Sequence, residues 1–364
     1  HASPLVREDA PEGVGVIWAW LQQHVPVAAR AVANPATDDA SAAADAEPPT
    51  LPVRVDAGRP QETAVVELGG AGRRITFGEL ATRVDDVARA LAAMIASATA
   101  TARVIKVAEV QPAGYPTVVA LQHMGDKLKQ ATDGRLEMKL YAGGVLGDED
   151  QTLQQVQLGA IDMIRVSLAP VTSIAPETSV LTLPYIFRDV DHMHNVLDGD
   201  IGREIADKFD NDPNARMVFL GWTDAGERNM ITKKPLVKPD DLRGMKIRVQ
   251  NSAISLATLK AMGANPVAMG VSEVFSAMQT GVVDGTENNP PTFVAHNYMP
   301  VAKYYTLSGH FIQPEMILFS KRAWDRLKPE EQALLKKLGK EAQDEERQLW
   351  ATYTEASIAK MKAG

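Results

Sequence analysis

The sequence of 364 residues contains no cysteine and little excess of positive charge anywhere, with a net charge of −8. Without cysteine there is no thiol nucleophile, no disulfide and no cysteine-ligated zinc. The absence also fits an oxidising compartment such as the periplasm. The negative net charge argues against a nucleic-acid-binding face. No apolar run reaches the roughly 18 residues that a membrane-spanning helix needs.

The usual catalytic motifs are absent as well. The chain has no G-x-S-x-G nucleophile turn, no Walker A loop and no complete G-x-G-x-x-G. His192 and His194 suggest a metal site, but two helical residues at this spacing point roughly 200° apart. We therefore predict no metal, no cofactor and no enzymatic activity.

The first hundred residues differ in composition from the rest. Residues 31–50 are almost all Ala, Asp, Pro, Thr and Ser, which is typical of a linker, and residues 16–32 and 75–94 have the spacing of short helices. We predict that residues 1–101 form an N-terminal extension. Residues 90–102, with two A-x-A patterns, have the texture of the end of a secretory leader. Residues 69–94 resemble the opening of adenylate-forming acyl-CoA synthetases, without that family's phosphate-binding or catalytic motifs.

From Arg103 the pattern becomes regular. A strand at 104–110, a helix at 117–134 and a strand at 135–144 follow one another, which predicts a parallel pair with a right-handed crossover. The second half repeats this order. In MKIRVQ (245–250) apolar and polar residues alternate, so Arg248 and Gln250 face away from the apolar side of their strand.

The stretch DGTENNPPTF (284–293) follows a helix predicted at 272–281, with Ser272 as N-cap, and a short strand at 282–283. We expect a loop at the carboxyl end of that strand, where open α/β sheets place their ligands. A plain turn is the competing interpretation, while the order of acids does not fit a calcium loop. An arginine near such a loop can hold a carboxylate through its planar fork, which makes Arg228 and Arg248 candidates.

Five segments together carry a family resemblance. From about residue 103 to the end, the chain resembles the DctP-type solute-binding proteins of TRAP transporters. The segments are GGVLGDEDQTLQQVQLGAIDM, VLTLPYIF, GERNMITKKPLVKPDDLRGMKIRVQ, MGANPVAMGVSEVFSAMQTGVVDGTENNPPTF and HNYMPVAKYY.

The resemblance implies a two-lobed periplasmic α/β binding protein with a ligand cleft between its lobes. It would be a monomer that closes around an organic acid and delivers it to a membrane permease. Residues 102–364 would form the binding domain. Residues 103–226 and 310–364 would belong to lobe I, and residues 227–309 to lobe II.

The resemblance also implies which residues bind the ligand. Arg248 is the expected carboxylate clamp, with Arg228 and Asn288 as further ligand residues. Adjacent amides suit sugar hydroxyls, so we favour a hexuronate or aldonate; a C4-dicarboxylate, or an enzyme built on the adenylate-forming-like segment, are the alternatives. The predicted ligand-binding set is Arg228, Arg248, Asn288, Asn289, Gln250, Arg165, Glu109 and His310.

Overall fold

The computed structural model describes residues 64–66, 73–75, 86–87, 89 and 102–363. The chain divides into two compact units, His1–Thr101 and Ala102–Gly364, and each is described by itself. In the first unit, β1 (Ala64–Val66) and β2 (Arg73–Ile75) form an antiparallel pair. Within the helix predicted at 75–94, Ile75 instead ends β2, whereas Asp86, Val87 and Arg89 are helical. The predicted linker at 31–50 and the predicted helix at 16–32 lie outside the described residues.

The second unit is built on one mixed sheet whose strands are ordered β4-β3-β5-β10-β6-β9-β7-β8. The strands on either side of the centre pair in parallel, as the strand–helix–strand pattern predicted. The two central strands, β6 and β10, are antiparallel to each other. The strands are β3 (Arg103–Ala108), β4 (Leu136–Tyr141), β5 (Met163–Ser167), β6 (Met217–Thr232), β7 (Lys246–Val249), β8 (Asn265–Ala268), β9 (Gly285–Asn288) and β10 (Tyr304–Ser320).

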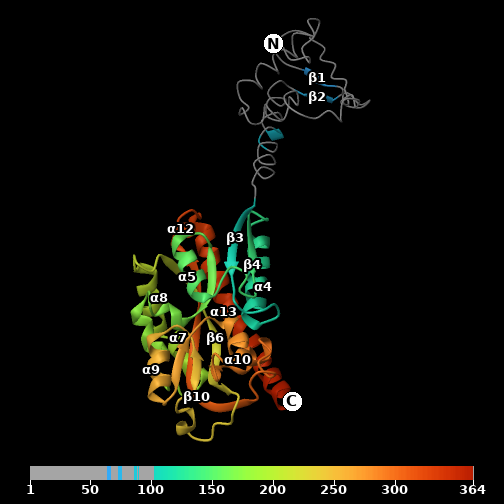
Figure 1. Ribbon diagram of the computed structural model, residues 1–364. Coiled ribbons are helices and arrows are strands. Elements are labelled where there is room, and N and C mark those ends of the chain that lie inside the picture. Colours follow the sequence, from blue (N-terminus) through green and yellow to red (C-terminus); the bar gives the residue numbers. More distant parts are fainter. Residues whose placement is uncertain (1–63, 67–72, 76–85, 88, 90–101, 364) are drawn as a thin grey trace, which may run out of the picture. The chain divides into compact units, whose positions relative to one another are not determined.

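Helices cover both faces of this sheet (Figure 1). We call the part around β4, β3 and β5 the first half, and the part around β9, β7 and β8 the second half. The α-helices are α4 (Pro116–Ala131), α5 (Glu149–Leu158), α6 (Leu168–Val171), α7 (Val190–Asp198), α8 (Asp200–Asn211), α9 (Ala253–Ala261), α10 (Val274–Thr280), α11 (Pro290–Ala295), α12 (Lys321–Trp324) and α13 (Pro329–Ala363). Short 3-10 turns are η1 (Pro176–Thr182), η2 (Pro239–Leu242) and η3 (Val271–Glu273).

The apolar face of α4, the helix predicted at 117–134, forms part of the core of the first half. Leu121, Met124 and Leu128 are buried with strand residues of β3 and with Leu335 and Leu338 of α13. Pro116 begins the helix, because a proline in the first turn loses no hydrogen bond there. The opposite face of this half is covered by a second cluster that includes residues of α5, α7 and α8.

The second half has its own core, and β7 shows how it is filled. Ile247 and Val249 are fully buried in an apolar cluster with Leu259 of α9, while Met245 packs against it. The predicted alternation is thus confirmed, and it turns Arg248 to the other side of the sheet.

Three long elements continue through both halves. β10 pairs with β5 in the first half over Glu315–Phe319, and β6 pairs with β9 in the second half over Asn229–Thr232. The 35-residue helix α13 also reaches from one half to the other, ending beside α10 (red in Figure 1). The predicted lobe boundaries fall inside β6 and β10 and stay a prediction.

The loop predicted at 284–293 was wrong. Gly285–Asn288 is a buried strand, β9, and the two prolines begin α11. The short strand predicted at 282–283 is absent there, and Ser272 lies in η3, whereas α10 has Glu273 as its N-cap. The sequence lacks the apolar pattern that would predict a strand here, because β9 carries buried polar residues.

Candidate functional site

A small cavity lies where the two halves of the sheet meet. Its volume is about 20 Å³, room for one water molecule and far less than a sugar acid occupies. Most of its wall is polar. It is lined by Val110, Gln111, Glu149, Ser167, Arg228, Arg248, Gln250, Val271, Asn288, Asn289, Thr292 and Glu315.

Arg248 is the buried cation of this cavity that lacks a counter-ion. Its side chain is 2% exposed, and its Nε and Nη2 donate to the backbone carbonyl of Met269 at 2.9 and 2.7 Å. Within residues 102–363, no carboxylate lies within ion-pair distance of it. Burial lowers the pKa of Arg248 from its usual value. A buried charge held only by a carbonyl dipole favours an anion that can enter the cavity.

Arg228 has the same residue type but the opposite situation. Its Nε and Nη2 bind the two carboxylate oxygens of Glu287 at 2.5 and 2.8 Å, forming a bidentate pair. Burial alone would lower the pKa of Arg228, but the Glu287 carboxylate outweighs burial and raises it. The same pair, against the effect of burial, lowers the pKa of Glu287 to about 2. The charge of Arg228 is therefore neutralised within the protein.

Arg165 lies behind the cavity wall and binds three carboxylates. It is fully buried, its Nε and Nη2 donate to Glu109, and its Nη1 donates to Glu149 at 3.2 Å and to Glu315 at 2.8 Å. Neither Arg165 nor Glu109 lines the cavity. Both residues also hold other side chains in place, since Glu109 accepts from Thr117 at 2.9 Å, and their ligand role stays a prediction.

The two asparagines of the DGTENNPP stretch differ in their hydrogen bonds. Asn289 caps α11 by accepting from Thr292 N at 2.7 Å, and its Nδ2 donates to Ala225 O at 2.8 Å. Asn288 accepts from Asn289 N at 2.9 Å and makes no hydrogen bond through Nδ2 to any described residue. Both asparagines line the cavity, but of the two only Asn289 donates a hydrogen bond through its Nδ2 to a described residue.

His310 is the remaining predicted ligand residue, and the structure places it away from the cavity wall. Its ring is fully buried, with Nε2 at 3.7 Å from Glu287 Oε2 and Nδ1 at 2.9 Å from Ser308 Oγ. Sequence reasoning missed Glu149, Ser167 and Glu315. The signal for Ser167 was present, because it ends β5 just as Asn288 ends β9.

Several hydrogen bonds join the two halves around the cavity. Gln250 Nε2 donates to Glu149 Oε2 at 3.3 Å, and the hydroxyls of Tyr115 and Thr292 lie 3.0 Å apart. His296 Nε2 lies 2.9 Å from Gln111 Oε1. These contacts indicate that the halves are closed on each other.

A further cross-contact, which we call the latch, lies at the start of α5. Asp148 Oδ1 accepts from Val271 N at 3.2 Å, and Asp148 Oδ2 accepts from Ser272 Oγ. Gly270 makes this approach possible, since a Cβ at that position would lie 2.1 Å from Asp148 Oδ2. The latch forms only when the two halves lie close together, and Val271 also lines the cavity.

Residues 107–364 match the family described as bacterial extracellular solute-binding protein, family 7 (DctP). The chain belongs to this family. It is therefore a periplasmic solute-binding protein of the TRAP type and not an enzyme, which removes the adenylate-forming alternative. A curated solute-binding protein of Chromohalobacter salexigens is 34% identical over 253 residues, covering 69% of this chain and 74% of the relative.

Two solved TRAP solute-binding structures from Citrobacter koseri reveal which state the present structure resembles. One holds bound D-glucuronate, is 66% identical, has a TM-score of 0.71 and covers 72% of this chain and 87% of its own. The other is open and without ligand, is 64% identical, has a TM-score of 0.63 and covers 71% and 86%. The DctP-family chain studied here is thus closer to the ligand-bound form, in agreement with its cross-contacts.

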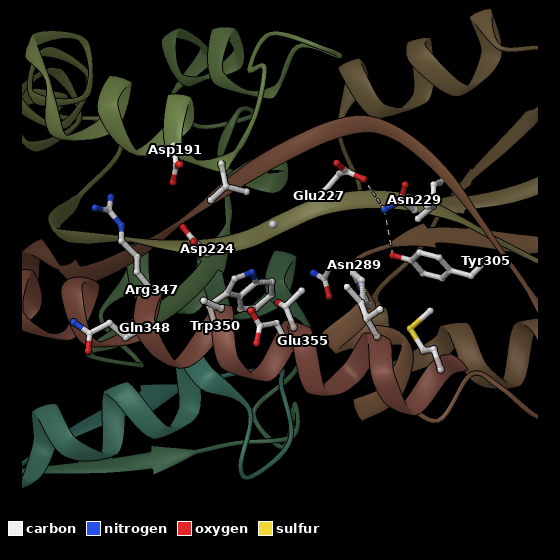
Figure 2. Close-up of a pocket in the computed structure, with 18 of the residues that line it drawn as sticks. Asp191, Asp224, Glu227, Asn229, Asn289, Tyr305, Arg347, Gln348, Trp350 and Glu355 are labelled. Carbon is white, nitrogen blue, oxygen red and sulfur yellow. Dashed lines mark hydrogen bonds between the residues drawn. The ribbon is translucent and has the colours of Figure 1, made fainter. Parts of the chain in front are cut away.

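This DctP-family protein also has a large groove on the other side of β6, with a volume of about 940 Å³ (Figure 2). Glu227 and Asn229 face this groove, while Arg228 between them faces the small cavity, as strand alternation requires. Trp350 and Arg347 of α13 line the opposite wall, and Arg347 is paired with Asp198 at 2.6 Å.

His194 of α7 lines the groove, and the two histidines of this helix diverge as predicted. His194 Nε2 is 2.8 Å from Asp224 Oδ1, whereas His192 Nδ1 accepts from Arg188 N at 3.2 Å. No group of three or more His, Asp or Glu among the described residues is arranged to hold a metal. None of the helices in the described part of the chain has the length and apolar character that crossing a membrane requires.

Proposed function

We propose that this protein is the periplasmic receptor for a hexuronate, with D-glucuronate as the first candidate, and that it delivers the acid to a TRAP permease. The observation that carries the proposal is Arg248, a buried cation in the cavity with no carboxylate partner. A carboxylate is the anion whose geometry matches its planar fork. The D-glucuronate bound to the relative from Citrobacter koseri supports the choice of ligand.

Recognition of the rest of the sugar follows from the other cavity residues. Asn288 can donate through its unengaged Nδ2, and Gln250 offers an amide from the same side as Arg248. Glu149 and Ser167 approach from the first half. A ligand that touches both halves stabilises the closed form relative to the open one, which is the basis of hinge closure.

The size of the cavity implies that the halves open before the ligand binds. A volume of about 20 Å³ cannot admit a sugar acid, so the halves must separate before the ligand enters. Closure then removes the carboxylate from water, and Arg248 supplies the charge that makes this removal favourable. We expect the receptor to act as a monomer and to dock on the permease in its closed form.

A C4-dicarboxylate is the alternative ligand that the charges disfavour. A second carboxylate would need a second unpaired cation in the cavity. Arg228 is committed to Glu287, and Arg165 is shared by three glutamates. A ligand with one carboxylate and several hydroxyls fits these partners better.

The proposal is tested by thermal shift of the purified protein against D-glucuronate, D-galacturonate, D-gluconate and succinate. A ligand that binds only the folded protein stabilises it by RT ln(1 + [L]/Kd), so at a hundredfold excess over Kd the gain is about 2.7 kcal/mol. We expect the uronates to raise Tm and succinate to leave it unchanged. A shift with succinate and none with either uronate contradicts the proposal.

A further inference from the structure

Two glutamates form one wall of the cavity, and neither was expected from the sequence. Glu149 is the first residue of α5, and Glu315 lies on β10 opposite Ser167 of β5. Each places one oxygen on the same donors. Glu149 Oε1 and Glu315 Oε1 both accept from Arg165 Nη1 and from the Ser167 hydroxyl, at distances between 2.8 and 3.2 Å.

The second oxygen of each glutamate is left for another partner. Glu315 is 4% exposed, and its Oε2 is buried without a hydrogen-bond partner in the part of the chain that the structure describes. Glu149 Oε2 accepts only the long 3.3 Å bond from Gln250. An unpartnered buried carboxyl oxygen costs free energy, so a donor that arrives with the ligand would recover it.

The charges of the cavity are unevenly distributed. On the first-half side, the single cation Arg165 serves Glu109, Glu149 and Glu315. On the second-half side, Arg248 has no carboxylate partner among the described residues. Burial and the neighbouring carboxylates raise the pKa of Glu315 to about 8, although Arg165 opposes them. A further negative charge at this wall is therefore unfavourable.

We propose that Glu149 and Glu315 are specificity-determining residues that restrict the receptor to ligands with a single carboxylate. Their second oxygens bind ligand hydroxyls, while a second carboxylate at this wall would lie against the Glu149 carboxylate and find no unpaired cation. The inference rests on the proposed function, because it presumes that Arg248 holds the first carboxylate. Beyond that function, it assigns the rejection of ligands with two carboxylates to the wall of Glu149 and Glu315, opposite Arg248.

The test compares D-glucuronate with D-glucarate, which carries a second carboxylate on the same carbon skeleton, by isothermal titration calorimetry. D-Gluconate, an open-chain acid with one carboxylate, controls for loss of the ring. The variants are Glu149→Gln and Glu315→Gln, and the matched control is Glu137→Gln on β4, outside the cavity.

We expect the wild type and Glu137→Gln to bind glucarate at least about a hundredfold more weakly than glucuronate, since like charges across an interface cost several kcal/mol. At least one wall variant should narrow that ratio by about tenfold or more, through a gain in glucarate affinity. Gluconate should bind more tightly than glucarate to the wild type.

A wild type that binds glucarate as tightly as glucuronate overturns the inference and leaves the proposed function intact. Glucarate affinity that rises in neither variant also overturns it. If one variant fails to fold, the wild-type ratio and the other variant decide. A wild type that binds no uronate removes the proposed function, and the inference falls with it.

Discussion

At the scale of single residues, Arg228 and Arg248 differ in their partners and not in their burial. Each is 2% exposed, yet Arg228 has a carboxylate in the protein and Arg248 has only a backbone carbonyl. Their pKa values consequently shift in opposite directions. We expect their substitutions to affect two different quantities, ligand affinity and protein stability.

Arg248→Ala should weaken D-glucuronate binding by about 2–5 kcal/mol, because the ligand carboxylate would lose its buried charged partner. Calorimetric titration measures the loss, and circular dichroism controls for folding. Near-wild-type affinity in a folded variant would show that Arg248 is not the carboxylate clamp.

Arg228→Met should instead lower the free energy of unfolding by about 3–5 kcal/mol, because it leaves Glu287 buried and unpaired. Urea denaturation measures the loss. The double variant Arg228→Met/Glu287→Leu removes both charges and should recover most of it. If the free energy of unfolding does not recover in the double variant, the loss in Arg228→Met is not explained by the unpaired charge of Glu287.

Binding of D-glucuronate should weaken above about pH 8, because Glu315 then loses its proton and adds a negative charge next to the anion. Since the raised pKa keeps Glu315 neutral below that value, affinity should change little between about pH 6 and 7. The groups that face Glu315 are Arg165 of β5, Glu149 of α5 and Glu109 after β3. Titrations of wild type and Glu315→Gln check this, and a loss of equal size in both would exclude Glu315 as its cause.

Sequence periodicity located some of these residues and not others. Arg248 and Gln250 could be placed because strand alternation fixes the side to which each points. Glu315 could not, because β10 is buried throughout its second part, and a carboxyl group among apolar neighbours has no periodic signature. The pairing of Arg165 with residues from three other elements depends on contacts that are distant along the chain.

At the scale of elements, the latch between α5 and η3 is the feature most open to test. Gly270→Ala would introduce a methyl group 2.1 Å from Asp148 Oδ2, although its own backbone φ of −61° accepts alanine. We expect this variant to fold as stably as the wild type but to bind D-glucuronate at least about tenfold more weakly, since closure becomes costly.

Ser272→Ala removes only the hydroxyl of the latch and should have a smaller effect in the same direction. Small-angle scattering in saturating ligand should show Gly270→Ala less compact than the wild type. If Gly270→Ala binds and compacts normally, the latch does not contribute to closure.

The same scale contains the main error of the sequence-based prediction. The composition of DGTENNPP is that of turns and predicts a loop, yet the stretch supplies strand β9 and the start of α11. Two of the polar residues have specific partners: Glu287 in the strand pairs with Arg228, and Asn289 after it caps the helix. Composition cannot reveal such partners, since they come from β6 and from the helix that follows.

At the scale of the whole molecule, residues 102–364 form a compact unit that contains every lining residue of the cavity. Deleting residues 1–101 should therefore leave the Kd for D-glucuronate within about twofold of that of the full chain. Calorimetry on both forms measures this, and circular dichroism confirms that the shorter form folds. A large loss of affinity in a folded short form would assign a binding role to the N-terminal unit.

The two halves of this receptor are joined by three regular elements, β6, β10 and α13. Both strands are continuous through the two halves, and β10 departs from regular pairing between Thr306 and Phe311 and again between Ile312 and Pro314. Opening must bend all three elements together. The stiffness of these elements therefore sets the fraction of empty receptor that is closed. Stiffening β10 at these irregular positions would hold the empty receptor closed and raise that fraction. Loaded and empty receptors would then compete for the same permease, which would lower the rate of transport.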